Sequence, residues 1–148
     1  MYKTLPGIFE IKLDNLKIQN SKMLMGEILH NIYYSARYIM RLMITNMDIG
    51  SSKIVKGFIN VITENKYLQQ LDITSTNMKP RHLLEISNEL KSHKSQFREL
   101  NFSYNKLDFS TPFSVDYEQS KEFLENIREI LEGSRILNHI NLSGMEIE

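Results

Sequence analysis

The sequence has no cysteine among its 148 residues. Disulfides, thiolate zinc sites, iron–sulfur clusters and cysteine nucleophiles are therefore excluded, and the composition fits a reducing compartment. No window reaches the roughly 18 unbroken apolar residues that a membrane-spanning helix needs. Charged residues interrupt the opening segment MYKTLPGIFEIKLDNL, which argues against a signal peptide. We therefore expect a cytoplasmic protein without a membrane span.

The sequence also lacks an excess of either charge and any catalytic motif. Its 18 Lys and Arg residues balance 18 Asp and Glu residues, so nothing in the overall charge attracts nucleic acid. The six glycines stand singly, without a phosphate-binding loop, and neither HExxH nor GxSxG occurs. His82 and His93 are expected to be solvated at opposite ends of a helix. The placement of His139 near Ser103 and Ser143 is only a weak indication of a hydrolase. We predict no enzyme activity, cofactor or metal.

What the sequence does contain is a repeated pattern. The segments LQQLDITSTNM (68–78) and FRELNFSYNKL (97–107) match at every apolar position of the frame LxxLxLxxNxL. The same frame fits five segments in all, at 8–18, 39–49, 68–78, 97–107 and 137–147. Self-similarity at this period predicts five units, each containing one short strand.

The stretches between the frames show helical spacing. The positions that mark these four helices, all apolar except Ser87, are Leu24, Ile28, Leu29 and Ile32, then Ile54, Val55, Phe58, Ile59 and Ile62, then Leu83, Leu84, Ser87 and Leu90, then Phe123, Leu124, Ile127, Ile130 and Leu131. Ser21, Ser51 and Ser52 are predicted N-caps, and Gly133 is predicted to end the last helix in the left-handed conformation.

The last predicted helix carries a row of carboxylates interleaved with basic residues. The row consists of Glu118, Glu122, Glu125, Glu129 and Glu132, with Lys121 and Arg128 between them. Its helical spacing predicts a solvent-exposed face with ion pairs between residues four apart. A docking site for a basic partner is the alternative interpretation.

A strand and a helix of this length cannot bury their apolar faces alone, so the units must stack on one another. We predict an α/β leucine-rich-repeat solenoid, a curved right-handed β-α superhelix of about five repeats in a single domain over 1–148. Short parallel strands would form its concave face and helices its convex face. An ordinary α/β domain of unrelated strands and helices is the alternative.

Residues 68–109, LQQLDITSTNMKPRHLLEISNELKSHKSQFRELNFSYNKLDF, resemble the ribonuclease-inhibitor-like class of leucine-rich repeats. This class includes ribonuclease inhibitor, the Ran GTPase-activating protein, tropomodulin, the sensor regions of NOD-like receptors and the CARMIL proteins. The resemblance implies a protein-binding scaffold within a CARMIL-like actin and cytoskeleton regulator. It also permits two alternatives, a regulator of a small GTPase and a ligand-sensing region of the NOD-like receptor type.

The chain departs from this class in three respects. The position that is usually Asn is filled by Leu16, Met47, Thr76, Asn105 and Met145. An insertion at 108–118 is predicted to be a loop that exposes Phe109, Phe113 and Tyr117. Both ends lack the polar units that normally cap such a stack, which predicts a segment of a longer array.

Side chains alternate across a strand, so residues between the inward-facing leucines should project from the concave face. We predict that this face binds the partner protein. Tyr104, Arg41 and Met43 are favoured because these residue types are enriched in interfaces. The predicted partner-binding residues are Arg41, Met43, Gln70, Asp72, Thr74, Glu99, Asn101, Ser103, Tyr104, His139 and Asn141.

Overall fold

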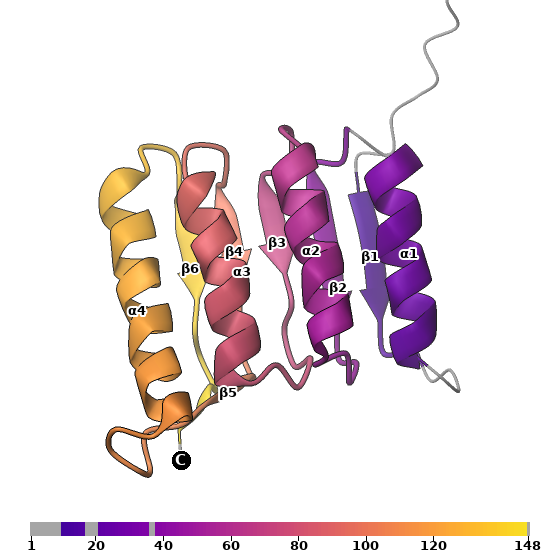
Figure 1. Ribbon diagram of the computed structural model, residues 1–148. Coiled ribbons are helices and arrows are strands. Elements are labelled where there is room, and N and C mark those ends of the chain that lie inside the picture. The colour runs from indigo at the N-terminus through magenta and orange to yellow at the C-terminus, as the bar shows by residue number, and fades with distance from the viewer. Residues whose placement is uncertain (1–9, 17–20, 36–37, 148) are drawn as a thin grey trace, which may run out of the picture.

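The computed structural model describes residues 10–16, 21–35 and 38–147. A five-stranded parallel sheet is covered on one side by four helices (Figure 1). The sheet strands are β1 (Glu10–Asp14), β2 (Arg41–Thr45), β3 (Gln70–Asp72), β4 (Glu99–Asn101) and β6 (His139–Asn141). The helices are α1 (Ser21–Ser35), α2 (Ser52–Glu64), α3 (Pro80–Ser92) and α4 (Val115–Gly133). Two short strands, β5 (Lys106–Leu107) and β7 (Glu146–Ile147), pair in a second sheet. The predicted α/β class with parallel strands is confirmed.

Each strand of the main sheet lies inside one of the five frames, and strands follow one another across the sheet in chain order. Equivalent frame positions are paired in register, as Leu42 with Leu71, Leu71 with Leu100, and Leu100 with Ile140. Ile8 and Ile18 of the first frame lie outside the described residues. The sequence repeat is therefore also a repeat of hydrogen-bonding register.

Apolar frame positions form the core between the sheet and the helices. In the three middle frames these side chains are buried, including Leu71 and Leu100 at 0% exposure. Helix α2 presents Ile54, Val55 and Phe58 to the same core. Ser51 is the N-cap of α2, as predicted, and accepts a hydrogen bond from Ile54 N at 3.4 Å. One continuous cluster thus joins successive units.

The turn after each main-sheet strand contains a residue in the left-handed region. The five residues and their φ angles are Asn15 (47°), Asn46 (55°), Ser75 (53°), Tyr104 (57°) and Gly144 (60°). In the first four, the N–H group donates to a carbonyl of the next unit, at 2.9 to 3.1 Å. These five positions hold four different residue types, so residue identity cannot reveal them, yet a left-handed residue follows each of the five main-sheet strands.

Asn105 connects two of these turns from a fully interior position. Its amide nitrogen donates to the carbonyls of Ile73 at 2.8 Å and Phe102 at 2.9 Å, and its Oδ1 accepts from Met78 N at 2.9 Å. Thr76, the equivalent residue one unit earlier, donates its hydroxyl to the same Oδ1 at 3.1 Å. A single buried side chain therefore satisfies backbone groups of both units.

The prediction for the end of α4 is wrong. Gly133 is the last helical residue, and the C-cap is Ser134 with φ −94°. A Cβ on Gly133 would collide with the side chain of Lys94, so the glycine provides room for a neighbouring residue and not a left-handed turn. Leu131 and Leu124 were predicted to face the core, but they are 51% and 38% exposed. Among the described residues, no further helix packs on that side of α4.

The predicted loop at 108–118 is shorter than expected. Helix α4 already begins at Val115 and runs for 19 residues, against 13 in α2 and 13 in α3, so part of the insertion lengthens the helix. Phe109 and Tyr117 are half-buried and pack edge to face, with ring centroids 5.5 Å apart. Only Phe113 is fully presented to solvent, at 89% exposure.

Candidate protein-binding surface

All four helices lie on one side of the sheet, which leaves the other side uncovered by described elements (Figure 1). We call this side the open sheet face. Strand register places eight of the eleven predicted residues on it, all except Thr74, Ser103 and Tyr104, in two rows that cross all five strands. The first row consists of Glu10, Arg41, Gln70, Glu99 and His139, and the second of Lys12, Met43, Asp72, Asn101 and Asn141.

First-row side chains make few contacts with the rest of the protein. Arg41 pairs with Glu10 at 3.3 Å, and both side chains are exposed. Gln70 reaches only the sulfur of Met43, at 3.8 Å. The side chains of Glu99 and His139 have no hydrogen bond or ion pair with the described residues. The first row therefore retains most of its hydrogen-bonding capacity for a partner.

The side chains of Asp72, Asn101 and Asn141 in the second row, in contrast, accept hydrogen bonds within the protein. Asp72 Oδ1 accepts from the N–H and the hydroxyl of Thr74, at 2.9 and 2.6 Å, while its Oδ2 accepts from Asn101 at 3.2 Å. Asn101 Oδ1 accepts in turn from the N–H and hydroxyl of Ser103, at 3.1 and 2.7 Å. Asn141 repeats the backbone part of this arrangement with Ser143 at 2.9 Å. These residues fix the turn after each strand.

Ser103, a predicted contact residue, does not project from the open sheet face. Its side chain is buried, with 2% of the residue exposed, because it is enclosed by Asn101 and by the Thr74 hydroxyl at 3.1 Å. Asp14 shows a more exposed version of the same turn. Hydrogen bonds from Thr45 and Asn46 hold the pKa of the Asp14 carboxyl below its ordinary value.

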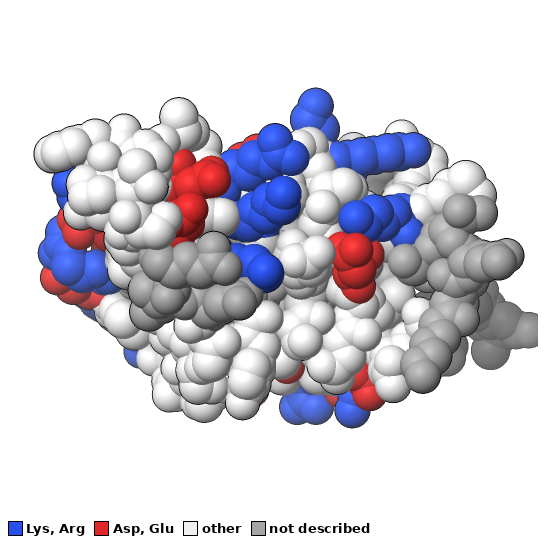
Figure 2. Space-filling view, turned by 90° about the horizontal axis from the view of Figure 1, so that it is seen from below, with Lys and Arg blue, Asp and Glu red and all other residues white. Residues whose placement is uncertain are grey.

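Tyr104 lies beside the open sheet face and not on it. It occupies the left-handed position of its turn, is 62% exposed, and its ring lies against Gly144. It lines a hollow of about 390 Å³ together with Asp48, Asn77 and Lys106. Figure 2 views the edge of the protein where strands end and helices begin, and Lys and Arg side chains gather over its centre. Tyr104 therefore belongs to a turn surface next to the predicted binding face.

The prediction that His82 is solvated is wrong, because it is completely buried at the start of α3. Burial, followed by the positive charges of Arg81 and Lys79, lowers the pKa of its imidazole from 6.5 to about 4. Lys79 N donates toward Nδ1 at 3.3 Å, and Arg81 Nε toward Nε2 at 3.1 Å. A neutral imidazole accepts a hydrogen bond at one nitrogen only. One of these two donors therefore makes a hydrogen bond to His82, and the other makes only a van der Waals contact. His82 is a structural residue of the helix start.

Asn126 is a buried polar link that the sequence analysis did not single out. Its amide nitrogen donates to Ser87 Oγ at 3.0 Å and Asn88 Oδ1 at 2.8 Å, and its Oδ1 accepts from Lys91 at 2.9 Å. These bonds join α3 to α4. Asn126 directly precedes Ile127 on the apolar side of α4, a placement that could have indicated a buried amide.

The carboxylate row of α4 forms the predicted solvent-exposed face. Arg128 pairs with Glu125 and with Glu132, the latter at 2.7 Å. Lys91 of α3 approaches Glu129 at 3.5 Å, and Lys121 approaches Glu118 at 4.0 Å. These ion pairs leave the row partly neutralised.

No group of three or more His, Asp or Glu side chains in the described ranges could hold a metal ion. None of the described helices combines the length and apolar character required to cross a membrane. No protein-family model matches the sequence, and the search of curated proteins finds no significant match.

Proposed function

We propose that this chain is a leucine-rich-repeat domain that binds a partner protein across the open sheet face. The observation that carries the proposal is the pair of registered side-chain rows on an uncovered sheet. Five strands in chain order, each followed by a left-handed residue, support the repeat class. The solenoid interpretation explains why a chain of this size has a sheet with one face left free.

Recognition falls mainly on the first row. Arg41 carries an exposed guanidinium, and its neighbour Met43 offers a half-buried apolar surface. Glu99 and His139 extend the row with further polar groups. The partner is therefore a polar protein surface with an acidic group near Arg41 and an apolar side chain near Met43. Asp72, Thr74 and Asn101 hold the turns in shape.

Site-specific photocrosslinking tests this placement. A photoreactive amino acid is introduced at Gln70, on the open sheet face, and in a matched variant at Lys121, on the exposed side of α4. Each chain is irradiated in cell lysate, and adducts are identified by mass spectrometry. We expect one reproducible protein adduct from position 70 that position 121 does not give. Equal labelling from both positions would contradict the proposal.

Substitutions then test the residues. Arg41→Glu reverses the charge in the first row, so we expect the captured protein to bind at least about tenfold more weakly, or about 1.4 kcal/mol. Lys121→Glu, at a side chain that is 68% exposed, is the control and should bind as the wild type. An unchanged affinity of Arg41→Glu would remove the first row from the interface.

The resemblance to cytoskeletal regulators makes a cytoplasmic actin-regulating scaffold the preferred setting for this binding. Regulation of a small GTPase is the alternative, and it predicts a rate change. GTP hydrolysis by purified small GTPases is measured with and without the chain. Acceleration would favour the alternative, and binding without acceleration would favour the scaffold.

A further inference from the structure

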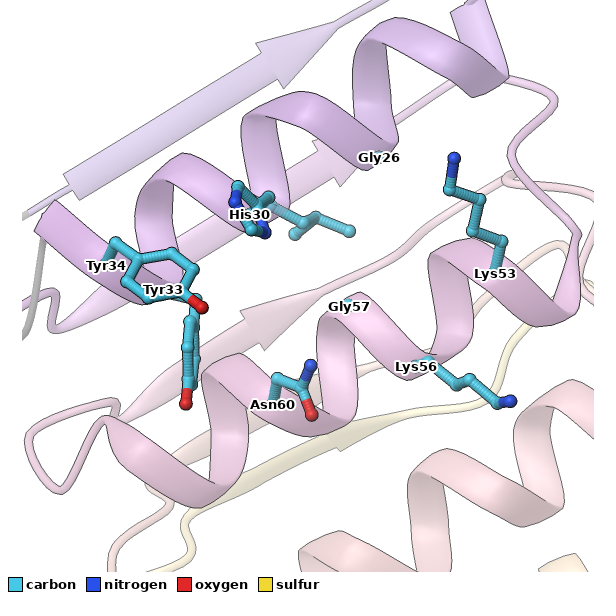
Figure 3. A pocket seen from close by; sticks show the side chains of 9 residues that line it. Gly26, His30, Tyr33, Tyr34, Lys53, Lys56, Gly57 and Asn60 are labelled. Carbon is cyan, nitrogen blue, oxygen red and sulfur yellow. The ribbon is translucent and has the colours of Figure 1, made fainter.

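A groove lies between α1 and α2, on the helix side of the protein and away from the open sheet face (Figure 3). Its main hollow has a volume of about 340 Å³, and an adjoining hollow of about 330 Å³ shares Gly26, His30 and Lys53 with it. Small-molecule sites commonly occupy about 300 to 1,000 Å³. We call this feature the interhelix groove, and its proposed role does not depend on partner binding by the sheet.

Two glycines determine the shape of the groove. A Cβ on Gly57 would lie 3.0 Å from the side chain of Leu29, so the helices meet closely there and the buried Leu29 closes the floor. At Gly26 the nearest atom to such a Cβ would be Lys53 Cε, at 3.7 Å. Among the described residues a flexible lysine is therefore the nearest neighbour at that end, which leaves the groove open beside Gly26.

The Gly26 end of the groove is cationic. Lys53, from the first turn of α2, extends across the gap toward Gly26, and Lys56 stands at the rim and points away from α1 (Figure 3). Neither ammonium group has an ion pair or hydrogen bond with the described residues. No carboxylate lines the main hollow, although Glu27 contributes to the adjoining one. A charged donor without an acceptor favours an anionic group such as phosphate.

The other end of the groove is aromatic. The rings of His30 and Tyr34 lie edge to face with centroids 4.6 Å apart, and Tyr33 meets Tyr34 at the same distance. Tyr34 is 62% exposed, so its ring offers an uncovered surface. Tyr33 extends toward α2 and Asn60, whose amide can form hydrogen bonds (Figure 3). This end suits a flat aromatic ring with polar edges.

The spacing of the two ends limits the ligand. At a rise of 1.5 Å per residue, Gly26 and Tyr33 are about 10 Å apart along α1. We propose that the interhelix groove binds a nucleoside diphosphate. The phosphates lie at Lys53, the ribose crosses the middle beside Gly57, and the base packs against Tyr33 and Tyr34 with a polar edge toward Asn60.

Titration of the full chain, followed by amide NMR shifts, tests the proposal with three probes. ADP carries both the base and the phosphates, adenosine lacks the phosphates, and inorganic pyrophosphate lacks the base. We expect ADP to shift signals of α1 and α2 and to bind at least about tenfold more tightly than either fragment, because only ADP occupies both ends. Equal affinity for all three probes would overturn the proposal.

Two variants and a control identify the site. Lys53→Gln removes the charge at an exposed position and should weaken ADP binding about tenfold while leaving adenosine unaffected. Gly26→Leu fills the open end, where a side chain has space to begin, and should abolish ADP binding. Lys121→Glu on α4 should bind ADP as the wild type. Helical content and melting temperature show that each variant is folded.

Further results would contradict nucleotide binding in the interhelix groove or separate it from partner binding. Unchanged ADP affinity in Lys53→Gln and Gly26→Leu would place any binding elsewhere. An acidic aromatic peptide that shifts the same signals while ADP does not would show a peptide groove, and the nucleotide proposal would then be wrong. Loss of ADP binding together with unchanged partner capture by the open sheet face would separate this groove from the proposed function.

Discussion

The middle of the sheet and its C-terminal edge follow the same sequence frame but differ in burial. Leu71 and Leu100, in the middle, are completely buried. Ile140 and Leu142, in the last unit, are only partly buried, and Leu131 above them is 51% exposed. A unit between two others is covered on both sides, whereas the last described unit is covered on one side. The frame thus determines which side chains face inward, and the neighbours determine how deeply they are buried.

The largest expected effect on stability comes from comparing two core truncations, one in the middle of the sheet and one at its edge. We expect Leu100→Ala to lower the free energy of unfolding by about 3 to 4 kcal/mol, because it leaves a cavity between two covered units. Ile140→Ala, paired with it in the sheet, should cost only about 1 to 2 kcal/mol, since part of that side chain already contacts water. Urea unfolding of both variants provides the measurement. Equal losses would show that the edge is as tightly packed as the middle.

The second test compares two asparagines. Asn105→Ala leaves the carbonyls of Ile73 and Phe102 and the N–H of Met78 without their partner, at a cost of about 2 to 3 kcal/mol. Asn141→Ala, at the edge, removes one half-exposed bond to Ser143 and should cost about 0.5 kcal/mol. Thermal unfolding of the two variants distinguishes them. A small loss for Asn105→Ala would mean that water replaces its amide.

The third test uses pH and the buried His82. Its pKa falls from 6.5 to about 4 on folding, so the unfolded chain binds more protons between these values. The stabilisation is fully present above pH 6.5 and is lost as the pH falls toward 4. At 1.36 kcal/mol per pKa unit, it amounts to at most about 3 kcal/mol. Unfolding free energies across this window should show a weaker pH dependence in His82→Gln. An identical slope in both proteins would contradict the assignment.

The smallest effects concern the two glycines of the interhelix groove. Gly26→Ala should raise the free energy of unfolding by about 0.5 to 1 kcal/mol, because alanine favours the helix and its methyl group has space. Gly57→Ala gains the same helix propensity but brings its methyl to 3.0 Å from Leu29, so the net gain should be smaller. Melting temperatures of the pair show the order. The reverse order would mean that Leu29 moves aside freely.

The sequence predicted the strands because strand frames depend on local alternation. All five main-sheet strands fall within the frames, and the residues of both rows lie on one face. The predictions fail where the environment of a residue depends on parts of the chain that are far away in the sequence. The side chain of Lys94 lies where a Cβ of residue 133 would be, and the absence of a described neighbour exposes Leu131. No local pattern in α4 contains that information.

The sequence predicted which side chains lie on the open sheet face, but not which of them already form hydrogen bonds within the protein. Alternation placed Asp72 and Asn101 on the open sheet face, as observed. It could not show that both are occupied by the turn residues that follow, because short Asp and Asn side chains serve turns and interfaces equally well. The interhelix groove was missed, since it depends on Gly26 and Lys53 from separate helices.

All four helices run in the same direction, with their first turns at the edge seen in Figure 2. Each helix behaves as if it carried about half a positive charge at its start and half a negative charge at its end. In a parallel arrangement these contributions add along the common direction of the helices. A chain with a formal net charge of zero thus still has a dipole moment from its four helices. Such a molecule turns in an electric field, and it arrives at a charged surface already oriented.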